Sequence, residues 1–259
     1  MIKVIVNGAG GSMGRLISKY LYPQNDMDLV DVVDPKGGTL LLKTIKASVK
    51  DAVENNCCDL IVDFTQPNAV NANAELYCKY NIPFVMGTTG GDREKLAQVV
   101  KDSNVSAVIA PNMAKQVVAF QSMMEYAAET FPNAFEGFSL EIVESHQESK
   151  KDTSGTAKAM VGYFNKLSIP FDPGQIEMIR DPEAQRAMGI PEEDLGGHGW
   201  HTYDLVSADE TVNLKFTHNI NGRVPYVLGT LDAIRFLYKK IQEGSKGEVF
   251  SMIDVLKGI

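Results

Sequence analysis

Short apolar runs alternate with amphipathic stretches from the N-terminus to Pro111. The apolar runs are typical of buried strands, whereas most of the stretches between them repeat apolar side chains at helical spacing. Such alternation predicts a parallel sheet covered by helices on both faces. The expected strands are Ile2–Val6, Leu29–Val33, Leu60–Val62, Pro83–Met86 and Ala107–Ile109, and the expected helices are Met13–Leu21, Ala69–Lys79 and Asp92–Lys101.

The pattern changes after Pro111. Periodicity fades over Pro170–Gly199, which is rich in Pro, Gly and charge, so we expect a long loop or arm there with about one helical turn. Two β-rich segments that follow predict an antiparallel hairpin. The expected order is helix Gln116–Thr130, strand Ser139–Val143, a polar loop, helix Ser154–Leu167, the arm, strands His201–Val206 and Thr211–His218, helix Pro225–Lys240 and one short final element.

These elements predict an α/β chain of two domains. Residues 1–115 and 225–259 form the parallel-sheet domain, and residues 116–224 form a smaller α+β domain inserted before the last long helix.

Composition narrows the function classes. With 44% hydrophobic and 22% charged residues among 259, the chain is an ordinary globular protein. Its net charge of −8 repels phosphodiesters, so we expect no nucleic-acid partner. No apolar run approaches the ~20 residues of a membrane span, and residues 1–6 are too short for a secretory signal. The 3 cysteines are sparse, which favours reduced thiols and a cytoplasmic location.

A glycine-rich turn follows the first expected strand and opens a helix. Gly8 permits the tight turn, Gly11 lets the backbone approach a pyrophosphate, and Gly14 lets the helix pack against the strand. Backbone N–H groups of Ser12 and Met13 would then face the phosphates at the helix N-terminus. The motif predicts a Rossmann dinucleotide-binding domain.

Asp34 closes the second strand, where an acidic side chain would bind the ribose hydroxyls of NADH. Lys36 could instead pair with the 2′-phosphate of NADPH, so the choice of cofactor stays open. Three further loops follow expected strands, and the carboxyl ends of parallel strands bind ligands in such sheets. The cofactor-binding candidates in these loops are Phe64, Thr65, Gly87, Thr88, Thr89, Pro111, Asn112 and Met113.

The polar segment 144–157 holds the catalytic candidates. Histidine is the common side chain whose unperturbed pKa lies near neutrality, so His146 suits a general acid. Lys150 offers a charged donor, and Ser154 can cap the following helix so that the N–H groups of Gly155 and Thr156 form a carboxylate site. Glu144 is interpreted as a structural or orienting carboxylate.

Arg223, before the last long helix, could clamp a second carboxylate. His198 and His201 are three residues apart, but no Cys, Asp or Glu completes an obvious ligand set, so we expect no metal and assign these histidines to orienting a loop near the site.

Over essentially its whole length the chain resembles the 4-hydroxy-tetrahydrodipicolinate reductase (dihydrodipicolinate reductase) family of lysine and diaminopimelate biosynthesis. Where the common bacterial form has a second histidine, this chain has Gln147, Glu148 stands in a usually basic place, and the loop is one residue shorter at Thr153-Ser154. It is similar instead to the plant-type branch. The segments that carry the likeness are 8–14, 63–65, 87–90, 110–113, 115–120, 144–147, 146–156 and 201–203.

The resemblance implies a reaction and roles for the candidates. Hydride would pass from NADPH or NADH to C4 of a cyclic dicarboxylate imine, with loss of water. His146 would be the acid, Lys150 would assist protonation and bind substrate, and Gln147 can hydrogen-bond substrate but cannot shuttle protons. Ser154, Gly155 and Thr156 would hold one carboxylate, and Arg223 would bind or support the same ligand.

The family often forms tetramers through a sheet in the second domain, which implies a homo-oligomer, tetramer or dimer, and the apolar strands around Ser139–Val143 and Thr211–Phe216 are compatible with it. Two alternatives stay open. One is another NAD(P)-dependent reductase of a small carboxylate or imine, such as an amino-acid dehydrogenase. The other is a non-enzymatic homologue that kept the cofactor fold; the presence of His146 and Lys150 favours an enzyme.

Overall fold

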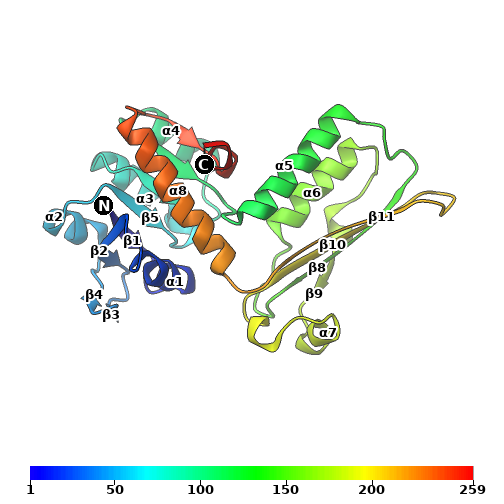
Figure 1. Cartoon of the computed structure of the whole chain (residues 1–259), viewed down its shortest axis with the longest axis horizontal. Helices are drawn as coiled ribbons and strands as arrows, with labels where there is room; N and C mark the ends of the chain where they lie inside the picture. The colour runs from blue at the N-terminus through cyan, green and yellow to red at the C-terminus, as the bar shows by residue number, and fades with distance from the viewer. Residues whose placement is uncertain (259) are drawn as a thin grey trace. The chain divides into compact units, whose positions relative to one another are not determined.

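The computed structural model describes residues 1–258, which form two compact units. The first unit comprises Met1–Val118 together with the chain from Val224 onward, and the second unit comprises Ala119–Arg223. Each unit has its own sheet (Figure 1).

The sheet of the first unit is parallel throughout and has the strand order β12-β7-β6-β5-β1-β2. All five strands expected from the sequence are present, and β12 is an addition at the edge. The chain leaves β1 toward β2 on one side and reaches β5 on the other, so the order reverses between β1 and β5. The bounds are β1 Ile2–Asn7, β2 Met27–Val33, β5 Leu60–Asp63, β6 Phe84–Met86, β7 Ala107–Ile109 and β12 Val249–Phe250.

Helices cover both faces of this sheet because its strands are apolar on both sides. Along β1, Val4 and Val6 pack in one core with α1, α8 and α9, whereas Ile5 packs in the other core with α2, α3 and α4. This doubly covered arrangement explains why the strands read as continuous apolar runs. The bounds are α1 Ser12–Leu21, α2 Val49–Asn55, α3 Val70–Lys79, α4 Arg93–Lys101, α8 Val224–Gln242 and α9 Met252–Gly258, with a small hairpin of β3 Thr39–Leu40 and β4 Lys43–Thr44 and a 3-10 turn at Pro67–Ala69.

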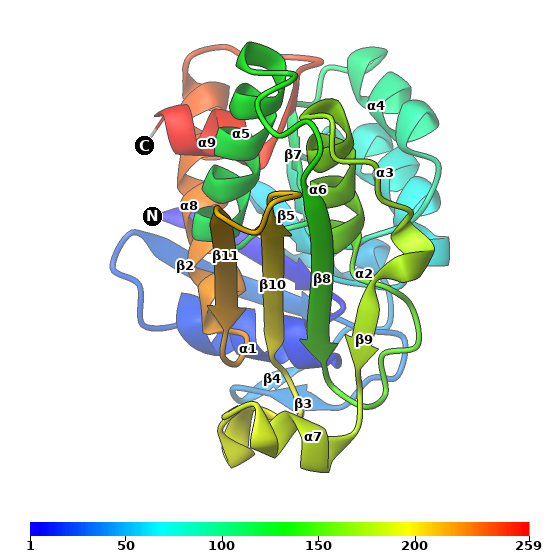
Figure 2. The ribbon, with the colours of Figure 1, turned by 90° about the vertical axis from the view of Figure 1, so that its right-hand side faces the viewer.

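The second unit is a four-stranded mixed sheet with two long helices on one face (Figure 2). Its strand order is β11-β10-β8-β9, and β10 with β11 forms the expected antiparallel hairpin. Side chains of α5 and α6 bury the inner face together with alternate residues of β8 and β10, such as Ile142 and Tyr203. The bounds are α5 Lys115–Thr130, β8 Ser139–His146, α6 Gly155–Lys166, β9 Glu177–Ile179, β10 Gly199–Val206 and β11 Asn213–Ile220.

Two expectations for this unit are wrong. Strand β8 does not end at Val143 but continues to His146, because Glu144, Ser145 and His146 pair with β10. The segment expected as a loop or arm is also more regular than its sequence indicates. It contains β9, the helix α7 (Pro182–Ala187) and 3-10 turns at Pro173–Gln175 and Glu192–Asp194, all too short to show a period.

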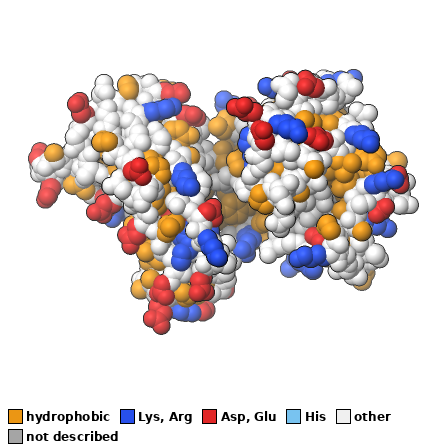
Figure 3. All heavy atoms as spheres, turned by 180° about the vertical axis from the view of Figure 1, so that it is seen from behind, with side chains coloured by type: hydrophobic (Ala, Val, Ile, Leu, Met, Phe, Trp, Pro, Cys, Tyr) orange, Lys and Arg blue, Asp and Glu red, His pale blue; other side chains and the backbone are white. Residues whose placement is uncertain are grey.

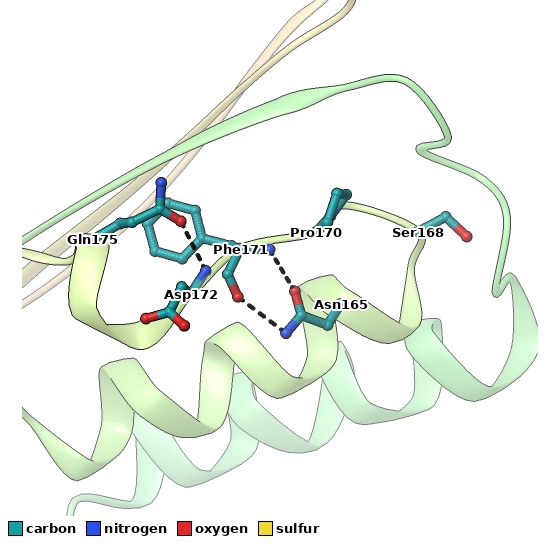
Figure 4. A pocket seen from close by; sticks show the side chains of 6 residues that line it. All are labelled: Asn165, Ser168, Pro170, Phe171, Asp172 and Gln175. Atoms are coloured by element: carbon teal, nitrogen blue, oxygen red, sulfur yellow. Dashed lines mark hydrogen bonds between the residues drawn. The ribbon is translucent and has the colours of Figure 1, made fainter.

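Side chains fix the beginning of this arm to α6. Asn165 on α6 donates to the carbonyl of Phe171 and accepts from the N–H of the same residue, at 3.2 and 2.8 Å. Asp172 and Gln175 form a reciprocal capping box around the next turn. These residues line a surface depression of about 510 Å³ (Figure 4). The arm therefore leaves α6 in a defined direction and enters β9, which pairs in parallel with β8.

Acidic and basic side chains are interspersed over the face shown in Figure 3. Within residues 1–258, no helix combines the length and apolar character needed to cross a membrane.

Candidate active site

The turn after β1 has the geometry that its glycines predict. Gly8 has a φ of +85°, and a β-carbon there would collide with the carbonyl of Phe64. A β-carbon at Gly14 would collide in turn with the carbonyl of Gly8, so α1 packs closely on the turn. Helix α1 begins at Ser12, and the exposed Gly11 lies at its start. This arrangement places a helix N-terminus beside the carboxyl end of β1.

A cavity of about 340 Å³ lies at the carboxyl ends of β1 and β5, where the strand order reverses. Open α/β sheets bind ligands at this position. Of the predicted cofactor-binding residues, the cavity is lined by Gly8, Gly11, Asp34, Lys36, Phe64 and Thr65.

The carboxylate of Asp34 is held against the glycine turn. One oxygen accepts from the N–H of Gly10 and the other from the N–H of Lys36, each at 3.0 Å. A β-carbon at Gly10 would lie 2.7 Å from the Asp34 carboxylate, so a larger residue there would displace this carboxylate. Lys36 is exposed and lines the same cavity as Asp34, so both side chains that bear on the choice of cofactor adjoin it.

Asp63 organises the loops that follow β5 and β6, a role that its sequence position did not reveal. Its buried carboxylate accepts from the hydroxyls of Tyr77 and Thr88 at 2.6 and 2.7 Å and from the amide of Asn73 at 2.9 Å. The side chain and N–H of Thr65 also donate to it. This network fixes Thr65 beside Thr88.

The other predicted loop residues differ in accessibility. The ring of Phe64 lies where a β-carbon at Gly87 would be, while Thr89 and Pro111 are exposed. Met113 is buried in the core, so only its backbone could reach a ligand. Asn112 accepts from the N–H of Ala114 at 2.9 Å. The glycine turn, the helix N-terminus and Asp34 together fit a dinucleotide.

In the second unit, a buried cluster of charged side chains surrounds His146. Glu144 is fully buried and accepts from Nδ1 of His146. Arg180 also binds this carboxylate with two hydrogen bonds, Nη2 donating to Oε1 at 2.6 Å and Nη1 donating to Oε2 at 3.3 Å. Burial raises the pKa of Glu144, but the hydrogen bonds from His146 and Arg180 outweigh this and hold the pKa at about 2. No sequence motif pointed to Arg180, which lies just after β9 in the arm.

Lys150 lies in a tight turn after β8. Its N–H donates to the carbonyl of Gln147 at 2.9 Å, and its ammonium pairs with the exposed carboxylate of Asp152 at 2.7 Å. The Lys150 side chain is itself 20% exposed. A cation therefore lies four residues after His146, and its partner in the structure is an exposed carboxylate.

The N-terminus of α6 adjoins this cluster. Ser154 caps the helix by accepting from the N–H of Ala157, as expected, and its hydroxyl also pairs with Nε2 of His201 at 3.0 Å. The N–H of Ser154 lies 3.4 Å from Oε1 of Glu144. Gly155 and Thr156 are the first residues of α6, which places the predicted carboxylate site beside the partner of His146.

All 4 histidines of the chain lie in the second unit. His198 pairs with Ser145 on β8 at 2.8 Å, and the ring of His201 stacks on His218 with centroids 4.4 Å apart. Burial lowers the pKa of His201 well below its usual value and lowers that of His218 to about 4. Both rings are therefore neutral near pH 7.

Donor atoms of Glu144, His146 and His201 lie within 4.8 Å of one another. However, His146 and Arg180 already use both oxygens of Glu144, and the positive guanidinium opposes a cation at this carboxylate. We therefore interpret the group as a hydrogen-bonded cluster.

Arg223 lies at the end of the second unit and donates to the carbonyl of Gly196 at 2.9 Å. A β-carbon at Gly197 would lie 2.6 Å from its guanidinium, so it is packed against the turn that precedes His198. This contact holds the arm, and a role for Arg223 in substrate binding stays a prediction.

The parallel sheet, the glycine turn and the cavity at the reversal of strand order define an NAD(P)-binding protein of the Rossmann type. Residues 2–113 match the profile described as dihydrodipicolinate reductase, N-terminus, and residues 116–256 match the profile described as dihydrodipicolinate reductase, C-terminus. The chain belongs to the dihydrodipicolinate reductase family.

Plant proteins are among its relatives. The chain is 44% identical to the probable 4-hydroxy-tetrahydrodipicolinate reductase 1, chloroplastic, of Oryza sativa subsp. japonica, over 98% of this chain and 78% of that one. It is 45% identical to 4-hydroxy-tetrahydrodipicolinate reductase 1, chloroplastic, of Arabidopsis thaliana, over 99% and 78%. A solved dipicolinate-bound dihydrodipicolinate reductase from Paenisporosarcina sp. TG-14 has the same fold, with a TM-score of 0.70 at 20% identity over 97% of each chain. The plant-type likeness read from the sequence is confirmed.

Proposed function

We propose that this chain reduces 4-hydroxy-tetrahydrodipicolinate to tetrahydrodipicolinate with NADPH or NADH, in the diaminopimelate route to lysine. Membership of the family over both halves of the chain supports the proposal. The observation that carries it is the charged cluster, in which His146 is bonded through Nδ1 to buried Glu144 and is followed by Lys150 and the N-terminus of α6.

The first unit would hold the dinucleotide, which supplies a hydride when bound. Backbone groups of the turn Gly8–Gly14, which includes Ser12 and Met13, would bind the pyrophosphate. Asp34 or Lys36 would bind the adenosine ribose or its 2′-phosphate. The remaining predicted contacts to the nicotinamide half come from Phe64, Thr65, Gly87, Thr88, Thr89, Pro111, Asn112 and Met113.

His146 would be the proton donor of the reaction. The net change replaces the C4 hydroxyl of the substrate by hydrogen: hydride arrives at C4, and the hydroxyl leaves with one proton as water. Glu144 accepts from Nδ1, so Nε2 is the atom of His146 that can give up a proton to the reacting molecule. A positioned acid of this kind contributes roughly 10²–10⁴-fold to a rate.

The substrate carries two carboxylates, and the second unit offers cationic and N–H donors for them. Lys150, Ser154, Gly155 and Thr156 would bind one carboxylate at the N-terminus of α6. Gln147, next to His146, would donate a hydrogen bond to the same ligand. Arg223 would complete this binding or support it from the turn at Gly196–Gly197.

The test is a coupled assay with purified protein. The substrate is generated in situ by its synthase, and oxidation of NADPH or NADH is followed at the nicotinamide absorbance. We expect rapid oxidation with both cofactors or a preference for one. The ratio of kcat/KM for NADPH to kcat/KM for NADH, measured for the wild type and for Lys36→Gln, gives the contribution of Lys36 to cofactor preference. A chain that binds the cofactor but oxidises none would support the non-enzymatic homologue. Turnover of a different imine would support the other reductase.

We also propose that the chain forms a homo-oligomer, a tetramer or dimer. Strand β11 is an edge of the second sheet, and its side chain Leu214 is 37% exposed. Sedimentation velocity tests this, since a monomer at micromolar concentration would contradict it.

A cytoplasmic location is the accompanying proposal, supported by three free cysteines. Because the plant relatives are named chloroplastic, fractionation of the source cell is the required measurement.

A further inference from the structure

Arg180 contacts three separate parts of the candidate site from its place in the arm. Its two Nη atoms hold the carboxylate of Glu144. Its Nε donates to the carbonyl of Lys150 at 2.8 Å, and Nη2 reaches the carbonyl of Asp152 at 3.3 Å. The side chain is 18% exposed, so these contacts are made largely out of water. One guanidinium thus joins β8 to the loop that carries Lys150.

Glu144 connects Arg180 to the groups that we propose take part in the reaction. It is fully buried, and besides Arg180 it binds Nδ1 of His146 and lies near the N–H of Ser154. A buried carboxylate is strongly unfavourable unless it is paired. Without Arg180 the carboxylate would tend to take up a proton and would no longer stabilise a protonated His146. The guanidinium is planar and donates two parallel hydrogen bonds, which lysine cannot reproduce.

We propose that Arg180 and Glu144 are a positioning pair for the chemistry. Arg180 keeps Glu144 ionised, and Glu144 holds the Nδ1–H of the His146 ring, so that Nε2 faces the reacting molecule and is the donating atom when the ring is protonated on both nitrogens. The same guanidinium holds the main chain of the Lys150 loop at a set distance from that ring. The inference rests on the proposed role of His146 as acid, and it assigns a function to the arm that family membership alone does not.

The competing explanation is that the pair serves stability alone, because Arg180, just after β9, also binds Glu144 on β8. The arm offers a matched control. Arg186 on α7 makes a similar two-bond pair with Glu192, but both side chains are exposed. We therefore compare Arg180→Lys with Arg186→Lys. For Arg180→Lys we expect kcat to fall roughly 10- to 100-fold, the range known for residues that orient metal ligands through a hydrogen bond, with KM for the cofactor unchanged. Arg186→Lys should retain wild-type kinetics.

The second readout does not depend on turnover. In the ligand-free protein labelled with ¹⁵N-histidine, the ring nitrogen shifts of His146 report which nitrogen carries the proton, and His146→Gln identifies the signals. Wild type should show protonated Nδ1, and Glu144→Gln should shift the ring toward the other tautomer. Asp204→Asn, which removes a carboxylate paired with Lys215 on the same sheet, should leave the signals unchanged.

The pH profile completes the test. In Glu144→Gln, protonated His146 lacks its carboxylate partner, so the alkaline limb of kcat/KM should move to lower pH. If Arg180→Lys and Glu144→Gln lower only the midpoint of thermal unfolding, and leave both the tautomer and the pH profile as in wild type, the pair is structural and the proposal is overturned. If the tautomer changes but the wild-type protein does not reduce the substrate, the positioning pair stands and the proposed reaction fails.

Discussion

Asp63 in the first unit and Glu144 in the second are both completely buried carboxylates near the carboxyl ends of central strands. They are stabilised by different kinds of hydrogen-bond donor. Asp63 is surrounded by neutral donors from Tyr77, Asn73 and Thr88. Glu144 is bound by a guanidinium and a histidine. The first network contains no second charge, whereas the carboxylate of Glu144 is hydrogen-bonded to a guanidinium and to an imidazole ring.

The difference separates two uses of a buried charge. Neutral hydrogen bonds fix the loops after β5 and β6 in one arrangement, as a cofactor platform requires. The cluster at Glu144 instead joins a buried carboxylate on β8 to the imidazole of His146 and, through Arg180, to the main chain at Lys150. We therefore expect changes at Asp63 to act on stability and cofactor binding, and changes around Glu144 to act on catalysis and its pH dependence.

The largest expected effect comes from His146→Gln. Loss of the acid should lower kcat by roughly 10²–10⁴-fold while the dissociation constant of NADPH stays near the wild-type value. Steady-state kinetics and fluorescence titration of the cofactor provide the two measurements. Unchanged turnover would show that His146 is not the acid. The charged cluster would then serve stability, as the network around Asp63 does.

Asp63→Ala should have an intermediate effect of the opposite kind. Buried Tyr77 and Thr88 and half-buried Asn73 would lose their common acceptor, and a buried donor left without a partner costs about 1–3 kcal/mol before the site relaxes. We expect a lower free energy of unfolding in urea and weaker NADPH binding. Tyr77→Phe removes one donor and leaves Asp63 with its other partners, so it serves as the milder control. Full stability of Asp63→Ala would show that the network is not needed to hold the platform.

Acid should distinguish the units by a smaller, graded effect. Burial lowers the pKa of His218 to about 4, so the unfolded chain binds more protons, and stability present above pH 6.5 is lost as the pH falls toward 4. Glu144, with its pKa lowered to about 2, adds a loss between pH 4.5 and 2. The single tryptophan, Trp200 on β10, reports the second unit in urea titrations.

The control for this prediction is His218→Gln, which should flatten the dependence between pH 6.5 and 4. An equal slope in wild type and variant would mean that His218 is not the group responsible. Amide hydrogen exchange in β1 and β5 follows the first unit under the same conditions, and we expect its protection to change less.

The sequence predicted the first unit well because long apolar strands and a glycine turn produce strong local signals. The loop around His146 was also recognisable, since its polar residues are adjacent in the chain. Arg180 was not, because its role depends on the parallel pairing of β9 with β8, and a three-residue strand leaves no periodic pattern. The part played by Asp63 was missed for a similar reason, because two of its partners, Tyr77 and Asn73, come from α3.

The ion pair between Lys150 and Asp152 has a consequence for how an anion enters. Before any ligand arrives, the ammonium already has a carboxylate partner from its own loop, and that partner is largely in water. At the proposed site, an incoming substrate carboxylate would therefore take the place of the Asp152 carboxylate beside this ammonium. Such an exchange would gain little net Coulomb energy, so we expect rapid departure of the product and a residence time of the dianion that depends on salt.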